Sequence, residues 1–320
     1  MKTNRPVLII DSLNLFTRHF IANPTISING EHVGGIVGFL KAIQLLCERF
    51  KPGKIFVIWE GGGSPRRRSL QSDYKNLSRP KRLNRYYEDD IPDTKENRNW
   101  QIASLIRFLK NSGIKQFYVS DCEADDVIGY LCQDILAGQD KIVVSSDKDL
   151  YQLISSDTKQ WSPGQKKMID SKAVFEKFGV YPENFCLVRS FVGDSSDNLR
   201  GIKGAGFKSV VKRFPEINSE KLLISDLIKL AEEKSQTSKL KLYKEIAENP
   251  DIPERNWKLM SLGYRNLSGQ QILKVNSILA QKNSPKNKLE FFREKNRVGI
   301  NNFDVERYFL SIRNLDNEPI

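Results

Sequence analysis

Acidic side chains gather at a few points of the sequence where an apolar pattern begins or ends. The stretch CEADDVIGYL, Cys122 to Leu131, places three carboxylates within four positions, directly before a helical pattern. Six more acids follow apolar runs or stand in the short stretches SSDKDL and GDSSDN. The complete set is Asp11, Glu60, Glu123, Asp125, Asp126, Asp147, Asp149, Asp194 and Asp197.

This set predicts a site for divalent metal ions. Each group has a structural alternative, because acids at a helix start complement the helix dipole by about 0.3–1 kcal/mol and polar stretches often form turns. Together, however, neighbouring carboxylates would repel one another without a counter-charge. Ligands that are all oxygen select a hard cation, Mg²⁺ or Mn²⁺. So many acids favour two ions, which can stabilise the attacking and the leaving oxygen of a phosphoryl displacement.

The remainder of the chain is basic, with 51 lysines and arginines against 39 aspartates and glutamates and a formal net charge of +12. Basic surface gains affinity for nucleic acid by releasing condensed counterions, although it can also serve solubility alone. The two histidines, His19 and His32, stand far from any nucleophile motif. This argues against catalysis by a histidine acid or base, and leaves carboxylates and metal.

Two basic stretches could contact a nucleic acid. The first, Ser64–Arg85, has eight basic residues and one acid between Arg66 and Arg85 and includes Tyr74. Cations beside an aromatic ring could hold a phosphate and an unpaired base, and the alternative is a solvated basic face. The second, Leu199–Phe214, reads LRGIKGAGFKSVVKRF. Its glycines suit a tight hairpin between two helices whose backbone N–H groups hold a phosphate, or simply a helix–helix turn.

Four nearly continuous apolar runs must position the acids, and helical patterns separate them. The runs are Pro6–Asp11, Lys54–Glu60, Gln116–Ser120 and Lys141–Asp147. This alternation predicts an α/β fold with a mostly parallel central sheet and helices on both faces. The acids follow the carboxyl ends of these runs, so they should converge on one edge of the sheet. Residues 160–170 predict a hairpin around Ser-Pro-Gly.

We expect two regions. An α/β catalytic core would span residues 1–184, with a basic gateway segment at about 64–98. A helical DNA-binding region would span 185–320, with a helix-hairpin-helix at about 194–214 and a C-terminal tail packing back on the core. No apolar run is long enough to cross a bilayer, the N-terminus lacks a secretory pattern, and the four cysteines form no CxxC pair. These features predict a cytoplasmic protein without a membrane partner.

The ordered set of motifs resembles the 5′-nuclease (flap endonuclease) superfamily, which includes bacteriophage 5′→3′ exonucleases, ribonuclease H-type enzymes and the nuclease domain of bacterial DNA polymerase I. The matching stretches are LIIDSLNLFTR, VIWEGGGSPRRR…YKNLSR, CEADDVIGYL, VSSDKDLYQL and FVGDSSDNLRGIKGAGFKS. They cover roughly residues 7–215 and imply a PIN-like core with a helix–three-turn–helix in the C-terminal region.

The resemblance also implies a role for each matching residue. The first metal ion would be held by Asp11, Glu60, Glu123 and Asp125, and the second held or oriented by Asp126, Asp147, Asp149, Asp194 and Asp197. Asp11, Asp125 and Asp147 would be catalytic through these ions, with Lys75 on the scissile phosphate and Arg79 or Arg82 as a second phosphate clamp. Nucleic-acid contacts would come from Arg18, Arg67, Tyr74, Arg82, Gly201, Lys203, Gly204, Gly206 and Lys208. The implied cofactors are two Mg²⁺ ions, replaceable by Mn²⁺, and K⁺ at the helix-hairpin-helix.

The sequence departs from the family pattern at two points. Glu60 stands where the family usually has aspartate, and its extra methylene could turn a direct ligand into one that acts through water. Lys75 and Arg79 are four positions apart instead of three, which leaves Arg79 and Arg82 as alternatives for the second clamp. Neither departure removes a charge.

We therefore predict a monomeric, metal-dependent, structure-specific 5′ nuclease. Its substrates would be DNA flaps, nicks or free 5′ ends, and RNA primers in RNA/DNA hybrids. It would contact replication proteins, and it would act in a bacterial host cell if a phage encodes it. The alternatives are a non-catalytic or one-metal nucleic-acid-binding relative, which the intact acid set disfavours, and a small-molecule phosphatase. The phosphatase alternative explains neither the glycine hairpin nor the basic run.

Overall fold

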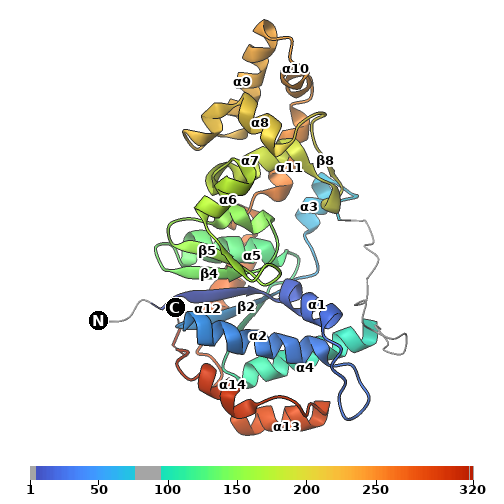
Figure 1. The fold of residues 1–320 in the computed structure, drawn as a ribbon, viewed down its shortest axis with the longest axis vertical. Helices are drawn as coiled ribbons and strands as arrows, with labels where there is room; N and C mark the ends of the chain where they lie inside the picture. Colours follow the sequence, from blue (N-terminus) through green and yellow to red (C-terminus); the bar gives the residue numbers. More distant parts are fainter. Residues whose placement is uncertain (1–4, 76–94, 317, 320) are drawn as a thin grey trace.

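The computed structural model describes residues 5–75, 95–316 and 318–319 (Figure 1). Arg79 and Arg82, the two alternatives for the second phosphate clamp, lie outside the described residues. Among those described, no helix has the length and apolar character needed to cross a membrane. All four cysteines are free and buried.

A six-stranded sheet forms the centre of the fold, in the order β3-β2-β1-β4-β5-β6. The first five strands are parallel and only β6 runs antiparallel, as the partner of β5 in a hairpin. The strands are β1 Val7–Asp11, β2 Lys54–Trp59, β3 Lys115–Tyr118, β4 Lys141–Val144, β5 Thr158–Ser162 and β6 Lys167–Ile169. The predicted mostly parallel α/β sheet is thus confirmed. The hairpin predicted for residues 160–170 is present as β5 and β6. The parallel pairing of β5 with β4 was not predicted from the sequence.

The apolar runs are continuous because helices cover both faces of the sheet. Along β1, Leu8 and Ile10 point into one core, while Val7 and Ile9 point into the other. The first core is covered by α1 Ser12–Ala22, α2 Gly34–Phe50, α4 Lys95–Asn111, α13 Lys288–Val298 and α14 Val305–Ser311. The second is covered by α5 Ala124–Tyr130 and α12 Gly269–Ala280, with the π-helical turn Leu131–Ile135 and the 3₁₀ helix Asp149–Leu153.

A third apolar core lies in the helical region at the far end of the long axis (Figure 1). Its helices are α6 Ser171–Phe178, α7 Phe185–Val192, α8 Phe207–Arg213, α9 Ile224–Thr237, α10 Lys241–Glu248 and α11 Asp251–Met260. Phe185, Phe191 and Phe214 are completely buried in it. After α11 the chain returns to the sheet, so the last three helices pack on the α/β core and not on this region.

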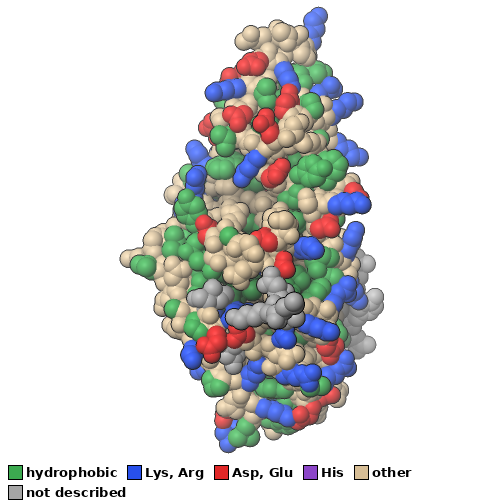
Figure 2. Space-filling view, turned by 90° about the vertical axis from the view of Figure 1, so that its left-hand side faces the viewer, with side chains coloured by type: hydrophobic (Ala, Val, Ile, Leu, Met, Phe, Trp, Pro, Cys, Tyr) green, Lys and Arg blue, Asp and Glu red, His purple; other side chains and the backbone are tan. Residues whose placement is uncertain are grey.

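Basic side chains are spread from one end of the long axis to the other on the face drawn in Figure 2, with acidic side chains between them. The net charge of +12 is therefore not gathered in a single patch on this face. A nucleic-acid site must accordingly be argued from individual side chains.

Candidate metal centre and nucleic-acid cleft

A cleft of about 1110 Å³ opens at the carboxyl edge of the sheet, between α1 and the end of α7. It lies where β2, β1 and β4 end side by side, which is where open α/β sheets bind ligands. Seven of the nine predicted acids line it: Asp11, Glu60, Asp125, Asp147, Asp149, Asp194 and Asp197. Its walls also carry four basic residues, which are Arg18, Lys75, Lys148 and Arg189.

Ser145 joins the acids that follow two adjacent strands. Asp11 is the last residue of β1, and its carboxylate accepts hydrogen bonds from the Asn14 N–H at 3.1 Å and from the Ser145 hydroxyl at 3.0 Å. The same Ser145 oxygen accepts the Asp147 N–H at 3.0 Å, and Asp147 in turn accepts the Asp149 N–H at 2.9 Å. The ends of β1 and β4 thus hold three carboxylates in a fixed relation.

Glu60 fixes the start of α5, which carries Asp125 to the cleft. The Glu60 carboxylate accepts the Ala124 N–H at 3.2 Å, at the positive end of the helix dipole. The next residue, Gly61, permits this close approach, because a Cβ there would lie 1.8 Å from the Val119 carbonyl oxygen. The departure from the family pattern at Glu60 therefore still leaves a carboxylate in the cleft.

A second carboxylate cluster lies where the helical region meets the sheet. One oxygen from each of Asp149, Asp194 and Asp197 lies within 4.8 Å of the others, close enough to share a cation. Arg189 on α7 pairs with Asp149 at 2.6 Å and with Asp194. We did not predict Arg189 from the sequence. Its signal is a single charge within the apolar helix FCLVRSFV, five residues before Asp194.

Several carboxylates of the cleft bind protons more tightly than ordinary acids. Burial, with the charges of Asp147 and Glu60 nearby, raises the pKa of Asp11 to about 6. Burial raises the pKa of Asp149 to about 7, although Arg189 opposes this shift. Burial, Asp11 and Asp147 raise the pKa of Asp125 well above its usual value. Packing acids this closely is unfavourable without a cation, so the oxygen-only set fits a hard divalent ion.

Lys75 points into the same site from the residues that follow α3 Pro65–Leu70. Its ammonium group lies 2.7 Å from Glu123 and 3.8 Å from Asp197. Burial alone would lower the pKa of Lys75, but Glu123 and Tyr74, with Asp197 and Asp125, together outweigh it and raise the pKa. Lys75 therefore stays protonated beside the acids, and its side chain remains 42% exposed. Glu123 itself is a partner of Lys75 behind the cleft wall and does not line the cleft.

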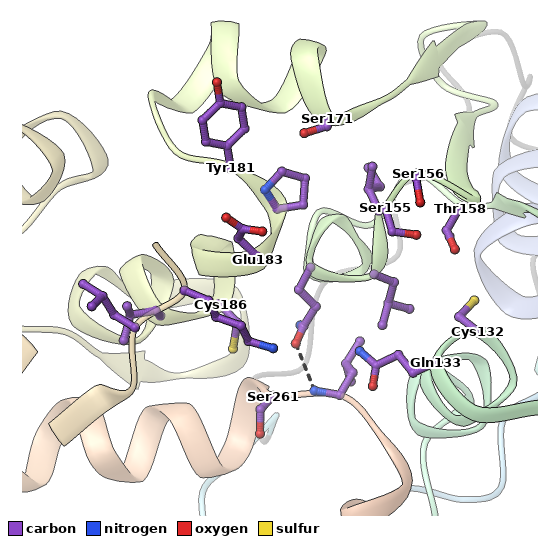
Figure 3. A pocket seen from close by; sticks show the side chains of 18 of the residues that line it. Cys132, Gln133, Ser155, Ser156, Thr158, Ser171, Tyr181, Glu183, Cys186 and Ser261 are labelled. Carbon is purple, nitrogen blue, oxygen red and sulfur yellow. Dashed lines mark hydrogen bonds between the residues drawn. The ribbon is translucent and has the colours of Figure 1, made fainter. Parts of the chain in front are cut away.

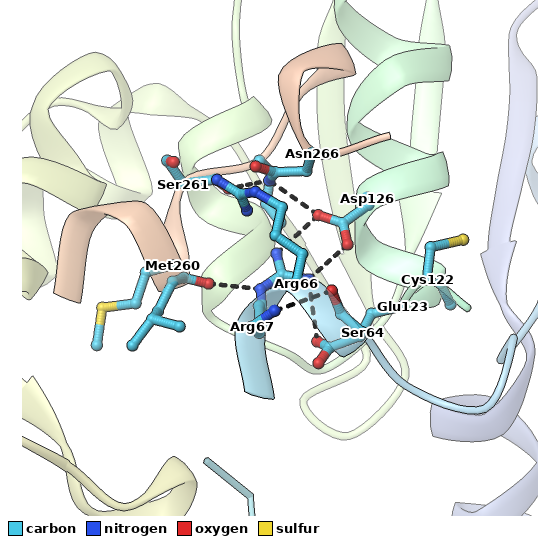
Figure 4. A network of polar contacts seen from close by, with 12 residues as sticks. Ser64, Arg66, Arg67, Cys122, Glu123, Asp126, Met260, Ser261 and Asn266 are labelled. Atoms are coloured by element: carbon cyan, nitrogen blue, oxygen red, sulfur yellow. Dashed lines mark hydrogen bonds and ion pairs between the residues drawn. The ribbon is translucent and has the colours of Figure 1, made fainter. Parts of the chain in front are cut away.

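Asp126 and Arg67 are both placed differently from our expectation (Figure 4). The Arg67 guanidinium donates to both Asp126 oxygens, at 2.5 and 2.7 Å, and to the Leu259 carbonyl at 2.7 Å. Asn266 donates to Asp126 at 2.9 Å. The exposed fractions are 0% for Asp126 and 1% for Arg67. A guanidinium with these buried partners cannot reach DNA, and Asp126 is committed to it, so neither predicted role agrees with the structure.

Tyr74 also differs from the prediction that it contacts nucleic acid. Its ring packs against Cys186, Leu199 and Met260 and is 9% exposed. Its hydroxyl lies 3.5 Å from Glu123, and burial raises the pKa of Tyr74. A ring enclosed in this way cannot stack on a base, so its role is to hold the segment that carries Lys75.

The glycine stretch connects α7 to α8 through a small ladder of β7 Gly193–Asp194 and β8 Leu199–Arg200. A Cβ at Gly201 would lie 2.1 Å from the Val192 carbonyl oxygen, and Gly204 has a φ of +81°. Gly206 precedes α8, and its N–H donates to the Ser209 hydroxyl at 2.8 Å. Lys203 and Lys208 are exposed beside this turn, and Arg18 is exposed on α1 at the cleft.

A separate cavity of about 890 Å³ lies between the core and the helical region (Figure 3). Its walls come from the turn Leu131–Ile135, residues 152–158 and the segment before α7. The Leu262 N–H donates to the Gln152 side-chain oxygen at 2.9 Å across one side. None of the nine acids lines it, so this cavity takes no part in the candidate metal site.

Comparison with known proteins identifies similar sequences and folds. Residues 6–179 match the family described as 5′-3′ exonuclease, N-terminal resolvase-like domain. The 5′-3′ exonuclease of Bacillus subtilis is 31% identical over 235 residues, covering 70% of this chain and 74% of its own length. The 5′-3′ exonuclease of Buchnera aphidicola subsp. Acyrthosiphon pisum is 27% identical over 311 residues, covering 91% and 96%.

A solved structure shares the fold. The bacteriophage T5 flap endonuclease, in a complex with DNA and metal ions, superposes with a TM-score of 0.66 at 19% identity. The match covers 86% of this chain and 98% of that protein.

Proposed function

The chain belongs to the 5′-3′ exonuclease family, and we propose that it hydrolyses DNA phosphodiester bonds beside a free 5′ end, at flaps and nicks. The protein is a nuclease, and the observation that carries this function is the wall of seven carboxylates facing Lys75 across one cleft. An acidic wall repels a polyanion unless divalent cations bind first. Activity should therefore depend strictly on metal.

Two groups of residues would hold the ions. Asp11, Asp125 and Asp147 suit one site, and Asp149, Asp194 and Asp197, whose oxygens lie within 4.8 Å of one another, suit the other. We propose Mg²⁺ as the natural ion, with Mn²⁺ able to replace it. When bound, such ions supply Lewis-acid polarisation of the phosphate and promote ionisation of water at neutral pH.

The chain's own cations would act on the phosphate. Lys75 stays protonated beside Glu123, and its exposed side chain can donate to a phosphate oxygen where negative charge develops. Arg189 neutralises Asp149 and Asp194 and so keeps their carboxylates in place. Arg18 on the opposite wall can contact the adjoining phosphate. Arg79 and Arg82 remain proposals for a further contact.

Duplex binding would come from the turn before α8. Lys203 and Lys208 are exposed there, and backbone N–H groups can contact phosphates without reading the sequence. The proposal includes a K⁺ ion at this turn and RNA primers as further substrates. It also includes contacts with replication proteins, a monomeric state and a cytoplasmic place of action. We further propose that the chain forms two domains that meet near residue 185.

The experiment uses a DNA duplex with a 5′ flap, labelled at its 5′ end. We expect release of the flap or short 5′ products in Mg²⁺ and none in EDTA. Asp147→Asn should lower the cleavage rate at least 100-fold while duplex affinity in EDTA stays within a few-fold. An Asp147→Asn protein that cleaves at the wild-type rate would remove this acid from the mechanism, and wild-type protein that binds without cutting would refute the nuclease assignment to this cleft.

A further inference from the structure

A second hollow, of about 820 Å³, adjoins the cleft and has a different chemistry. It lies between α1, α2 and the turn of the β5–β6 hairpin, and we call it the α1–α2 groove. Leu15, Leu46 and Trp161 are buried in its floor, and Leu45 at its edge is 59% exposed. No acid of the metal site lines it. Its floor is thus apolar where that of the cleft is acidic.

Four cations stand on the walls of the groove: Arg18, Lys41, Arg49 and Lys166. Within residues 5–75, 95–316 and 318–319, none of them forms an ion pair with a carboxylate. The single acid of the lining, Glu48, is already bound, because its carboxylate accepts bonds from Arg307 at 3.0 Å and Gln44 at 3.0 Å. The groove therefore carries uncompensated positive charge, which is complementary to phosphate.

One of these cations also offers a flat surface. The Arg49 guanidinium lies over the Trp161 ring, 4.3 Å from its centroid. An arginine held in this way can stack on an unpaired base. Paired bases of a duplex would expose only phosphate and sugar to such a floor, so the combination of cations and apolar surface favours a single strand.

The groove is continuous with the cleft. Arg18 and Ala22 line both, and the hairpin turn borders both, since the Gly164 N–H donates to Ser146 on the cleft wall at 3.2 Å. In Figure 1, α8 lies toward the helical end of the long axis, and α1 and α2 lie toward the opposite end. A strand that passes the metal site from the helical region would reach the groove next.

We propose that the α1–α2 groove binds a short single-stranded stretch of the DNA substrate that adjoins the reacting phosphate. The proposal rests on the proposed nuclease function. Lys41, Arg49 and Lys166 contact the phosphates, and the bases lie on the apolar floor and on Arg49. The groove would therefore give the enzyme a preference for substrates with a gap over substrates in which that stretch is paired.

The test compares two 5′-flap duplexes that differ only in whether a single-stranded gap beside the flap is open or filled. Lys41→Ala combined with Arg49→Ala should bind the gapped duplex about tenfold more weakly in EDTA. The slope of affinity against salt should fall by about 1.4 for two lost contacts to a single strand. Affinity for the filled duplex should stay within about twofold. The control variant, Lys282→Ala combined with Arg293→Ala, also removes one lysine and one arginine, on α13 and the chain just before it. It should change the affinity for neither duplex.

Leu45→Ser tests the apolar floor without disturbing the core. Wild-type protein should prefer a gap with bases to an abasic gap by about threefold or more, and Leu45→Ser should lose this preference. Equal affinities of the double variant and the wild type for the gapped duplex would overturn the proposal, as would equal losses on both duplexes. If the wild type cleaves both duplexes in Mg²⁺ but the variants match it, only the groove proposal fails. If the wild type cleaves neither, the proposed function fails first.

Discussion

Asp125 and Asp126 are neighbours in the sequence, and the structure predicts opposite consequences of removing them. Asp125 lines the cleft, whereas Asp126 is 0% exposed and bonded to Arg67 and Asn266. Asp126→Ala leaves the buried Arg67 guanidinium with only the more distant carboxylate of Glu123, at 3.7 Å. Asp125→Asn removes one of several repelling acids. The pair is a matched comparison at adjacent positions of one helix.

The magnitudes follow from burial and bonding. Breaking a buried ion pair by removing one partner costs about 3–5 kcal/mol, and Asn266 also loses an acceptor for its amide. Asp126→Ala should therefore lower the free energy of unfolding by about 4 kcal/mol, a large part of the roughly 5–15 kcal/mol typical of a folded protein. Asp125→Asn should leave stability in EDTA equal or higher, because burial, Asp11 and Asp147 disfavour the ionised form of Asp125.

Two assays measure these effects. Urea unfolding in EDTA and in Mg²⁺ gives the stability of each variant, and flap cleavage at a temperature where the variant is folded gives its activity. We expect Asp126→Ala to be destabilised in both buffers and still to cleave when folded. Asp125→Asn should be stable, lose cleavage at least 100-fold and gain less stability from Mg²⁺ than the wild type. Replacing both Arg67 and Asp126 by apolar residues should recover part of the loss. Normal stability of Asp126→Ala, or cleavage by Asp125→Asn, would contradict the opposite orientations of these two side chains.

Four other expectations concern the site and its supports. In EDTA, the free energy of unfolding should fall as pH rises from about 4 to about 7. The pKa values of Asp11 and Asp149 are raised to about 6 and about 7 in the folded state. The folded state therefore binds more protons than the unfolded state in that pH range. Saturating Mg²⁺ should remove this dependence, and a flat profile in EDTA would argue against the packing of the acids. Arg189→Met should lower the free energy of unfolding by about 3 kcal/mol in EDTA and by less in Mg²⁺, since the ion replaces the lost cation beside Asp149 and Asp194. Lys208→Gln should reduce the salt slope of duplex binding by about 1 while the cleavage rate at saturation is retained, and an unchanged slope would place the duplex elsewhere. Gly201→Ala should cost about 1–3 kcal/mol in urea unfolding, because its Cβ would meet the Val192 carbonyl oxygen at 2.1 Å.

Local patterns in the sequence were enough to identify the sheet and the edge where the acids meet. The apolar runs became β1 to β4 because residues buried on both faces must be apolar along their whole length. The acids directly after those runs met at one edge because parallel strands all end on the same side. The prediction of a metal site followed from side-chain type alone, since carboxylates without histidine or cysteine select hard cations.

Only the tertiary structure decided which way each side chain faces. Successive residues of a helix point about 100° apart, so Asp125 reaches the cleft while Asp126 meets Arg67, and no local pattern distinguishes the two. Arg189 and Tyr74 acquired their roles from segments that are distant in the sequence: Arg189 meets Asp149, and Tyr74 packs against Met260. The α1–α2 groove has the same origin, because its floor and its cations come from α1, α2 and the β5–β6 hairpin far along the chain, which only folding brings together.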